Sequence, residues 1–126
     1  MKNSKRIAWQ RGNFATFAEI EVELNSGRSG YDLTVPLGID LVDGRWRSGV
    51  LLALSLLREK LPRVLDSMDT QVTIKAFRGQ PGDTTSMAAA YVMFHAVAEL
   101  LAPELLEEFV FDEEKAEYTI ASPRIN

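Results

Sequence analysis

One stretch of the chain, Thr70–Leu101, predicts a strand, a tight loop and a helix in succession: TQVTIKAFRGQPGDTTSMAAAYVMFHAVAELL. Apolar and polar residues alternate over residues 70–77, which is the period-two pattern of a half-buried strand. The loop at 78–83 is dense in glycine and proline, as tight turns are. Residues 85–101 are rich in alanine and methionine and lack both glycine and proline, so they predict a helix.

Two further strands are expected on the N-terminal side of this unit. Residues 14–24 alternate strictly near their end, where three apolar residues alternate with glutamates, so one face is expected to be buried and the other wet. Residues 31–37 predict a second strand, joined to the first by a turn-rich segment in an antiparallel hairpin. The expected wet face carries Glu19, Glu21 and Glu23, and Lys75 on a neighbouring strand is placed to pair with them.

A Leu-rich helix is predicted over residues 50–61. Ser48 is a plausible N-cap for this helix, and Pro62 stops it. The helix at 85–101 is expected to be capped by Asp83 or Thr84.

The two ends of the chain complete the predicted fold. Residues 1–12 are polar and basic, and they predict either a flexible arm or a short leading strand. Residues 109–111 and 117–120 predict a last hairpin or an edge strand. The order is then roughly β-β-α-β-α-β, which predicts an α+β two-layer sandwich within a single domain spanning residues 1–126.

Composition excludes several classes of protein. The chain has 126 residues, 46% hydrophobic and 25% charged, which suits one globular domain. Because it has no cysteine, disulfides, thiolate metal sites and cysteine nucleophiles are excluded. The basic N-terminus is not followed by the apolar stretch of about 7–15 residues that a signal peptide has, and no apolar run reaches the about 20 residues of a membrane span, so a cytoplasmic protein without membrane contact is expected. The net charge of -4 does not favour nucleic acid as a partner.

No group of residues predicts a catalytic, cofactor or metal site. His95 is the only histidine, and a zinc site normally needs several nitrogen or sulfur ligands, so we expect a structural role for it. Ser86 lacks the context of a nucleophile elbow and is interpreted as a first-turn helix residue. The loop at 78–83 opens a helix but lacks the lysine and the glycine spacing of a phosphate-binding loop. The glutamate row is interpreted as a solvated face.

Several stretches resemble the fourth domain of elongation factor G and its ribosome-protection relatives. The resemblance covers about residues 9–110 and rests on a pattern of strand, loop and helix with a few identities. The matching stretches are Arg11-Gly12-Asn13-Phe14, the helix ending at Leu61, Val72-Thr73-Ile74-Lys75-Ala76-Phe77-Arg78-Gly79 with Asp83, Ser86, Met87 and Ala88, and Ala102-Pro103-Glu104-Leu105-Leu106-Glu107.

The resemblance implies a ribosomal protein S5 domain 2-like fold. In that family two loops at the tip of the domain reach the decoding region of the small ribosomal subunit, and the matching positions are residues 11–15 and 79–83. This chain departs from the family at both tips: Gly82 stands where a histidine is usual, and Ala15 stands where a glycine is usual. The chain also has no nucleotide-binding motif, so GTP hydrolysis is not expected.

The preferred hypothesis is a non-catalytic binding or assembly module, acting on a protein partner or as a homodimer. The alternative is a ribosome- or RNA-binding protein acting through loops 11–15 and 78–83, with Trp9 or Phe14 stacking on a base. A small-molecule kinase is the least favoured hypothesis, since no glycine-rich phosphate loop is present. The residues expected to contact the partner or RNA are Arg11, Asn13, Phe14, Lys75, Arg78, Gln80 and Asp83.

Overall fold

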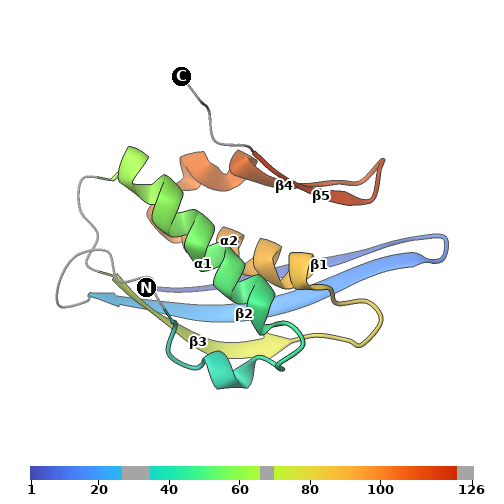
Figure 1. Cartoon of the computed structure of the whole chain (residues 1–126), viewed down its shortest axis with the longest axis horizontal. Coiled ribbons are helices and arrows are strands. Elements are labelled where there is room, and N and C mark those ends of the chain that lie inside the picture. The colour runs from blue at the N-terminus through green and yellow to red at the C-terminus, as the bar shows by residue number, and fades with distance from the viewer. Residues whose placement is uncertain (27–34, 66–69, 122–126) are drawn as a thin grey trace.

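The computed structural model describes residues 1–26, 35–65 and 70–121. Its strands are β1 Lys2–Arg11, β2 Phe14–Ser26, β3 Thr70–Arg78, β4 Phe109–Asp112 and β5 Glu117–Ile120; its helices are α1 Arg47–Lys60 and α2 Ser86–Leu101. Short 3-10 helices occupy Ile39–Leu41, Leu61–Arg63 and Pro103–Glu108. Strands β1, β2 and β3 form one sheet in that order, with both helices on one side of it (Figure 1). The α+β prediction is confirmed.

The N-terminal residues form a long hairpin. β1 and β2 pair antiparallel without interruption from Lys2 opposite Glu23 to Arg11 opposite Phe14. The two-residue turn between them starts at Gly12, whose φ of 61° suits the first position of a type II′ turn. Of the two alternatives for residues 1–12, the structure has the strand. Only alternate residues of β1 face the helices, and just two of these, Ile7 and Trp9, are hydrophobic.

The predicted hairpin between residues 14–24 and 31–37 is wrong. β2 already has β1 on one edge and β3 on the other, so no edge remains for residues 31–37. Leu37 instead forms a parallel bridge to Thr73 on the far edge of β3, where its N–H donates to the carbonyl oxygen of Val72 at 3.0 Å. Residues 31–34 lie outside the described part of the chain.

The helices lie where they were predicted, but both predicted caps are wrong. α1 begins at Arg47, with Trp46 at the N-cap position, so Ser48 lies inside the first turn. α2 is capped by Thr85, whose side-chain oxygen accepts a hydrogen bond from the N–H of Ala88 at 3.0 Å. Thr84 is buried and does not cap α2, because its hydroxyl donates to the carbonyl oxygen of Phe17 in β2.

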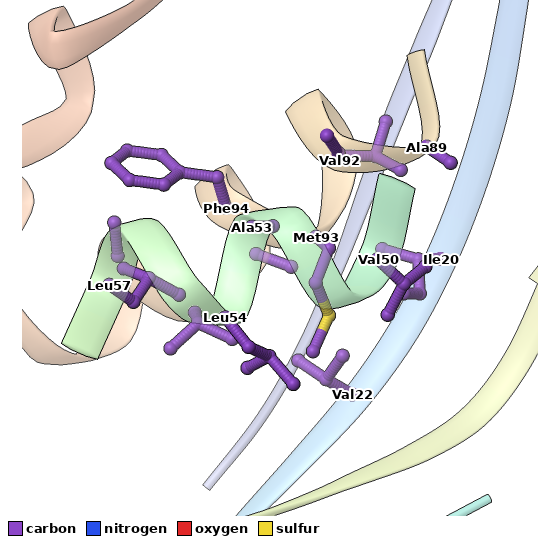
Figure 2. Close-up of a cluster of buried hydrophobic side chains, with 14 of the residues drawn as sticks. Ile20, Val22, Val50, Ala53, Leu54, Leu57, Ala89, Val92, Met93 and Phe94 are labelled. Atoms are coloured by element: carbon purple, nitrogen blue, oxygen red, sulfur yellow. The ribbon is translucent and has the colours of Figure 1, made fainter. Parts of the chain in front are cut away.

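The core fills the space between the sheet and the two helices. Alternate residues of β2, including Ile20 and Val22, point into it and are fully buried. Side chains from α1 and α2 meet them there, as Figure 2 shows for Val50, Ala53, Leu54, Leu57, Ala89, Val92, Met93 and Phe94. The helices pack closely at Gly49, where an added Cβ would stand 2.0 Å from the carbonyl oxygen of Ser86.

The opposite face of the sheet is open and charged. The predicted alternation of β2 is confirmed, since Glu21 is exposed between the buried residues Ile20 and Val22. β3 bulges opposite this region: Glu21 lies opposite Ala76 and Val22 opposite Ile74, which leaves Lys75 unpaired in the ladder. The bulge brings the ammonium of Lys75 within 3.7 Å of Glu23, as predicted.

The C-terminal part forms the predicted hairpin. β4 and β5 pair antiparallel as a separate two-stranded sheet, with Ala116 at a positive φ of 53° in the turn. In Figure 1 this hairpin extends toward the same end of the molecule as the β1–β2 turn. No helix among the described residues is long and apolar enough to cross a membrane.

Candidate functional site

The turn of the long hairpin presents an aromatic side chain to solvent. Phe14 is 45% exposed although it is a large apolar residue. Arg11 lies directly opposite it on β1, so both side chains stand on the same face of the hairpin. Trp9 lies edge-on to Phe14, with ring centroids 5.7 Å apart. We call residues 9–14 the hairpin end.

The hairpin end is supported from beneath by the C-terminal hairpin. The ring of Trp9 packs against Phe111 of β4, with centroids 5.2 Å apart, and Phe111 packs against Tyr118 of β5 at 4.8 Å. The hydroxyl groups of Tyr118 and Thr16 lie 2.6 Å apart and share a hydrogen bond. Burial raises the pKa of Tyr118, so its hydroxyl keeps its proton in this bond. These contacts fix the ring of Trp9, which in turn orients Phe14.

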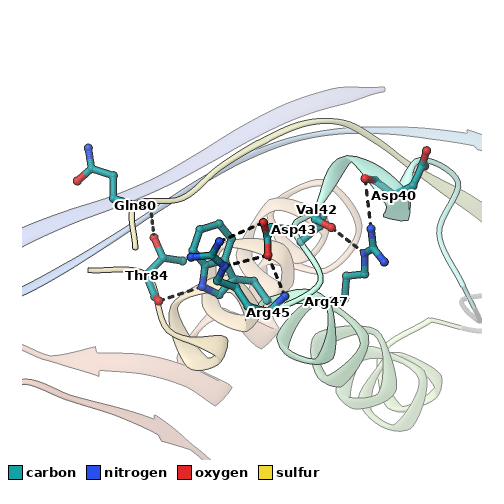
Figure 3. Close-up of polar contacts among 8 residues, drawn as sticks. Asp40, Val42, Asp43, Arg45, Arg47, Gln80 and Thr84 are labelled. Atoms are coloured by element: carbon teal, nitrogen blue, oxygen red, sulfur yellow. Dashed lines mark hydrogen bonds and ion pairs between the residues drawn. The ribbon is translucent and has the colours of Figure 1, made fainter. Parts of the chain in front are cut away.

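The loop before α2 is fastened to β2. The N–H of Phe17 donates to the carbonyl oxygen of Asp83 at 3.1 Å, and the hydroxyl of Thr84 donates to the carbonyl oxygen of Phe17 at 2.6 Å. Thr84 also accepts from the N–H of Gln80 at 2.7 Å (Figure 3). Trp46 closes the loop from below by donating its indole N–H to the carbonyl oxygen of Thr84 at 3.0 Å.

A cleft separates this loop from the hairpin. It encloses about 270 Å³ and is lined by Ala8, Trp9, Gln10, Ala15, Thr16, Phe17, Gln80 and Asp83. The predicted contact residues Gln80 and Asp83 therefore border the same cleft as the base of the hairpin end. Arg11, Asn13 and Phe14 lie beyond the cleft at the turn itself.

The two other predicted contact residues lie on the open sheet face and are engaged in ion pairs. Arg78 is directly opposite Glu19, and its guanidinium lies 3.3 Å from that carboxylate. Arg6 approaches Glu19 from the other neighbouring strand at 3.8 Å. Lys75 is held by Glu23 in the same way. Positive charge on this face is thus compensated by the glutamate row, and the seven predicted residues fall into two groups instead of one surface.

His95 is buried and connects two elements of the fold. It is 7% exposed, and its Nε2 lies 2.6 Å from the carbonyl oxygen of Phe109, which ties α2 to β4. Burial lowers the pKa of His95, so the neutral ring that donates from Nε2 is the favoured form near neutral pH. Ser86 lies near Ser48, with hydroxyl oxygens 3.4 Å apart, and does not meet the imidazole. Within residues 1–26, 35–65 and 70–121, no group of three metal-ligating side chains comes together.

Sequence reasoning missed the residues that support the site. Trp46, Thr84 and Tyr118 act through contacts with segments that are distant in sequence, and nothing in their neighbours signals this. One signal was present at the turn, because Gly12-Asn13 between two extended runs is a recognised hairpin pattern.

No protein-family model matches the chain, and no curated protein matches it.

Proposed function

We propose that this chain is a non-catalytic binding module that docks a protein partner through its hairpin end. One observation carries the proposal: Phe14 is exposed yet held in place by Trp9, with Arg11 beside it. Aromatic residues and arginine are the residue types enriched in the energetic centres of protein interfaces. An anchor already fixed in its bound position loses little conformational entropy on binding.

The alternative, ribosome or RNA binding through loops 11–15 and 78–83, has less support. In Figure 1 the β1–β2 turn and the loop between β3 and α2 lie toward the same end of the molecule, which is the observation in favour of this alternative. However, binding to nucleic acid depends on cationic side chains that can contact phosphates. Arg78 and Lys75 are paired with carboxylates, which leaves Arg11 as the main basic group at this end among the predicted contact residues.

Two further statements belong to the proposal. A homodimer is also an assembly function, and it would form through a part of the sheet other than the hairpin end. A cytoplasmic location is supported by the absence of cysteine, which fits a reducing compartment.

Photo-crosslinking tests the proposal. A photoreactive amino acid at Asn13 is expected to capture a protein in cells, and adding Phe14→Ala is expected to abolish the adduct. The same group at Glu59, on the exposed side of α1, controls for random collisions. Adducts at Asn13 that consist of RNA, or that persist in the Phe14→Ala chain, would reject a protein-binding hairpin end.

Co-sedimentation with small ribosomal subunits tests the alternative. Ribosome binding that weakens with salt and is lost in Arg11→Glu and Arg78→Glu would favour it. Absence of binding at low salt excludes it.

A further inference from the structure

The outer edge of β1 has backbone groups that pair with no residue in the described part of the chain. Met1 and Leu24 exchange two hydrogen bonds, of 2.9 Å and 2.7 Å, so they form a hydrogen-bonded pair of the antiparallel ladder. Because such pairs alternate along a ladder, every second residue from Met1 bonds to β2, and the residues between them point N–H and C=O outward. The outward residues are Lys2, Ser4, Arg6, Ala8 and Gln10, and no described residue bonds to their backbone.

The two edges of the sheet differ. The far edge of β3 is blocked, since Leu37 bonds to it on both sides of Thr73 and the bulge at Lys75 breaks its regularity. β1 has neither protection: it is ten residues long, contains no proline, and pairs with β2 in one unbroken register. A long regular edge is a template for pairing with another strand.

Two of the four charged side chains on β1, Lys5 and Arg6, are already paired within the chain and therefore guard the edge only weakly. Lys5 lies 3.6 Å from Glu99 of α2 on the helix side. Arg6 lies 3.8 Å from Glu19 on the open side. An edge is defended by charges that lose solvation or repel when a second strand arrives. Lys5 and Arg6 resist an incoming strand only weakly, because each is already paired with a glutamate.

We propose that β1 pairs antiparallel with β1 of a second copy of this chain, about a two-fold axis at Ile7. In this register Arg6 lies opposite Ala8 and Lys5 lies opposite Trp9, so no like charges face each other directly. The neighbouring register, centred on Arg6, would set two arginines against one another. The half-buried Ile7 side chains would meet across the axis on the helix side.

The pairing would join two three-stranded sheets into one. The β1 edges of both copies would then be paired, and the joined sheet would end on the two blocked β3 edges. Assembly would therefore stop at the dimer. Antiparallel pairing also points the two hairpin ends in opposite directions. The dimer would therefore present two separate copies of the surface proposed above, although its existence does not depend on that proposal.

Cysteine scanning of the full chain tests the register, since the natural sequence has no cysteine. Ile7→Cys is expected to form a disulfide-linked dimer, because opposed residues of a non-hydrogen-bonded pair have Cα atoms about 4.5 Å apart. Ala8→Cys is the matched control and is expected not to cross-link, because its counterpart across the axis is Arg6. Equal cross-linking of both variants, or none in Ile7→Cys, overturns the register.

Sedimentation equilibrium tests the dimer itself. The unmodified chain is expected to be dimeric and Ala8→Pro monomeric, because proline removes an N–H that points away from β2 and is tolerated on edge strands. Ala8→Arg, which places two like charges opposite each other, is expected to weaken the dimer about two- to tenfold with no change in fold. A monomer at all concentrations, or a dimer unaffected by Ala8→Arg, overturns the proposal even where Ala8→Pro fails to fold.

Discussion

The hydroxyl of Thr84 donates a hydrogen bond to the carbonyl oxygen of Phe17 at 2.6 Å. This bond continues the pairing of β2 beyond the end of β3 and places the loop that begins at Gly79 against the hairpin. The same hydroxyl oxygen accepts from the N–H of Gln80 at 2.7 Å, so one buried side chain connects both segments that line the cleft.

Replacing Thr84 by valine keeps its shape and removes both bonds. We expect Thr84→Val to lower the free energy of unfolding by about 1–3 kcal/mol, since two backbone groups lose their partner in a buried place. Thr85→Ala, which removes the cap of α2, is expected to cost about 1 kcal/mol. Urea denaturation measures both. A Thr84→Val chain as stable as the wild type would show that the loop is not held by this residue.

The contact between the helices predicts a contrast between two glycines. In Gly49→Ala the new methyl group would stand 2.0 Å from the backbone of Ser86, so α1 and α2 must separate, and about 1–3 kcal/mol of stability is expected to be lost. Gly44→Ala has no neighbour within 4 Å and serves as the control. Thermal unfolding of the two variants should differ. Equal melting temperatures would refute the close packing at Gly49.

His95 predicts a pH dependence of stability. Burial lowers the pKa of His95 in the folded protein, and the nearby Lys5 lowers it further. The hydrogen bond to Phe109 and the nearby Glu99 act in the opposite direction but do not outweigh burial. The ring of Tyr91 packs against the imidazole. The unfolded chain therefore binds a proton first as the pH falls. The stabilisation is complete above a pH of about 6.5 and is lost as pH falls below that value, with a slope of at most about 1.4 kcal/mol per pH unit.

The measurement is the unfolding free energy of the wild type and of His95→Gln across this pH range. Glutamine does not titrate, so the wild type should lose stability more steeply than the variant below a pH of about 6.5. Parallel curves would mean that His95 is not buried as a neutral ring.

The charged face of the sheet predicts small effects on stability. Glu19 forms ion pairs with two arginines, Arg6 and Arg78, and all three side chains are substantially solvated. Glu19→Gln is therefore expected to lower the free energy of unfolding by less than about 1 kcal/mol. Glu21→Gln, on the same strand and face, is the matched control. Glu19→Gln releases two cations, so an increase in RNA affinity in that variant alone would revive the RNA alternative.

The main elements could be predicted because their signals are local. The alternation of β2 and the alanine-rich pattern of α2 follow from burial on one face, which the periodicity of the sequence records. β1 was ambiguous because its helix-facing positions include Asn3 and Lys5, whose polar groups bond to α2 and leave no apolar stripe.

The pairing of strands and the support of the site could not be predicted. Leu37 pairs with β3 because both edges of β2 are taken, and that fact depends on β1. Lys60 is similar: it is 3% exposed and reaches Glu108 at 3.7 Å, a contact that no spacing in the sequence reveals. Of the predicted contact residues, those at the hairpin turn were placed together because they are adjacent in sequence.

The most direct test of the protein-binding hairpin end is the affinity of the partner captured at Asn13 for three purified chains: wild type, Phe14→Ala and Val64→Ala. Val64 is a matched control, since it is 38% exposed and lies just after the C-terminal end of α1. In Figure 1 that end of α1 points away from the β1–β2 turn. If Phe14 is the anchor, its removal weakens binding by about 30-fold or more, while Val64→Ala changes it less than about threefold. Equal effects of the two substitutions would contradict a binding site at the hairpin end.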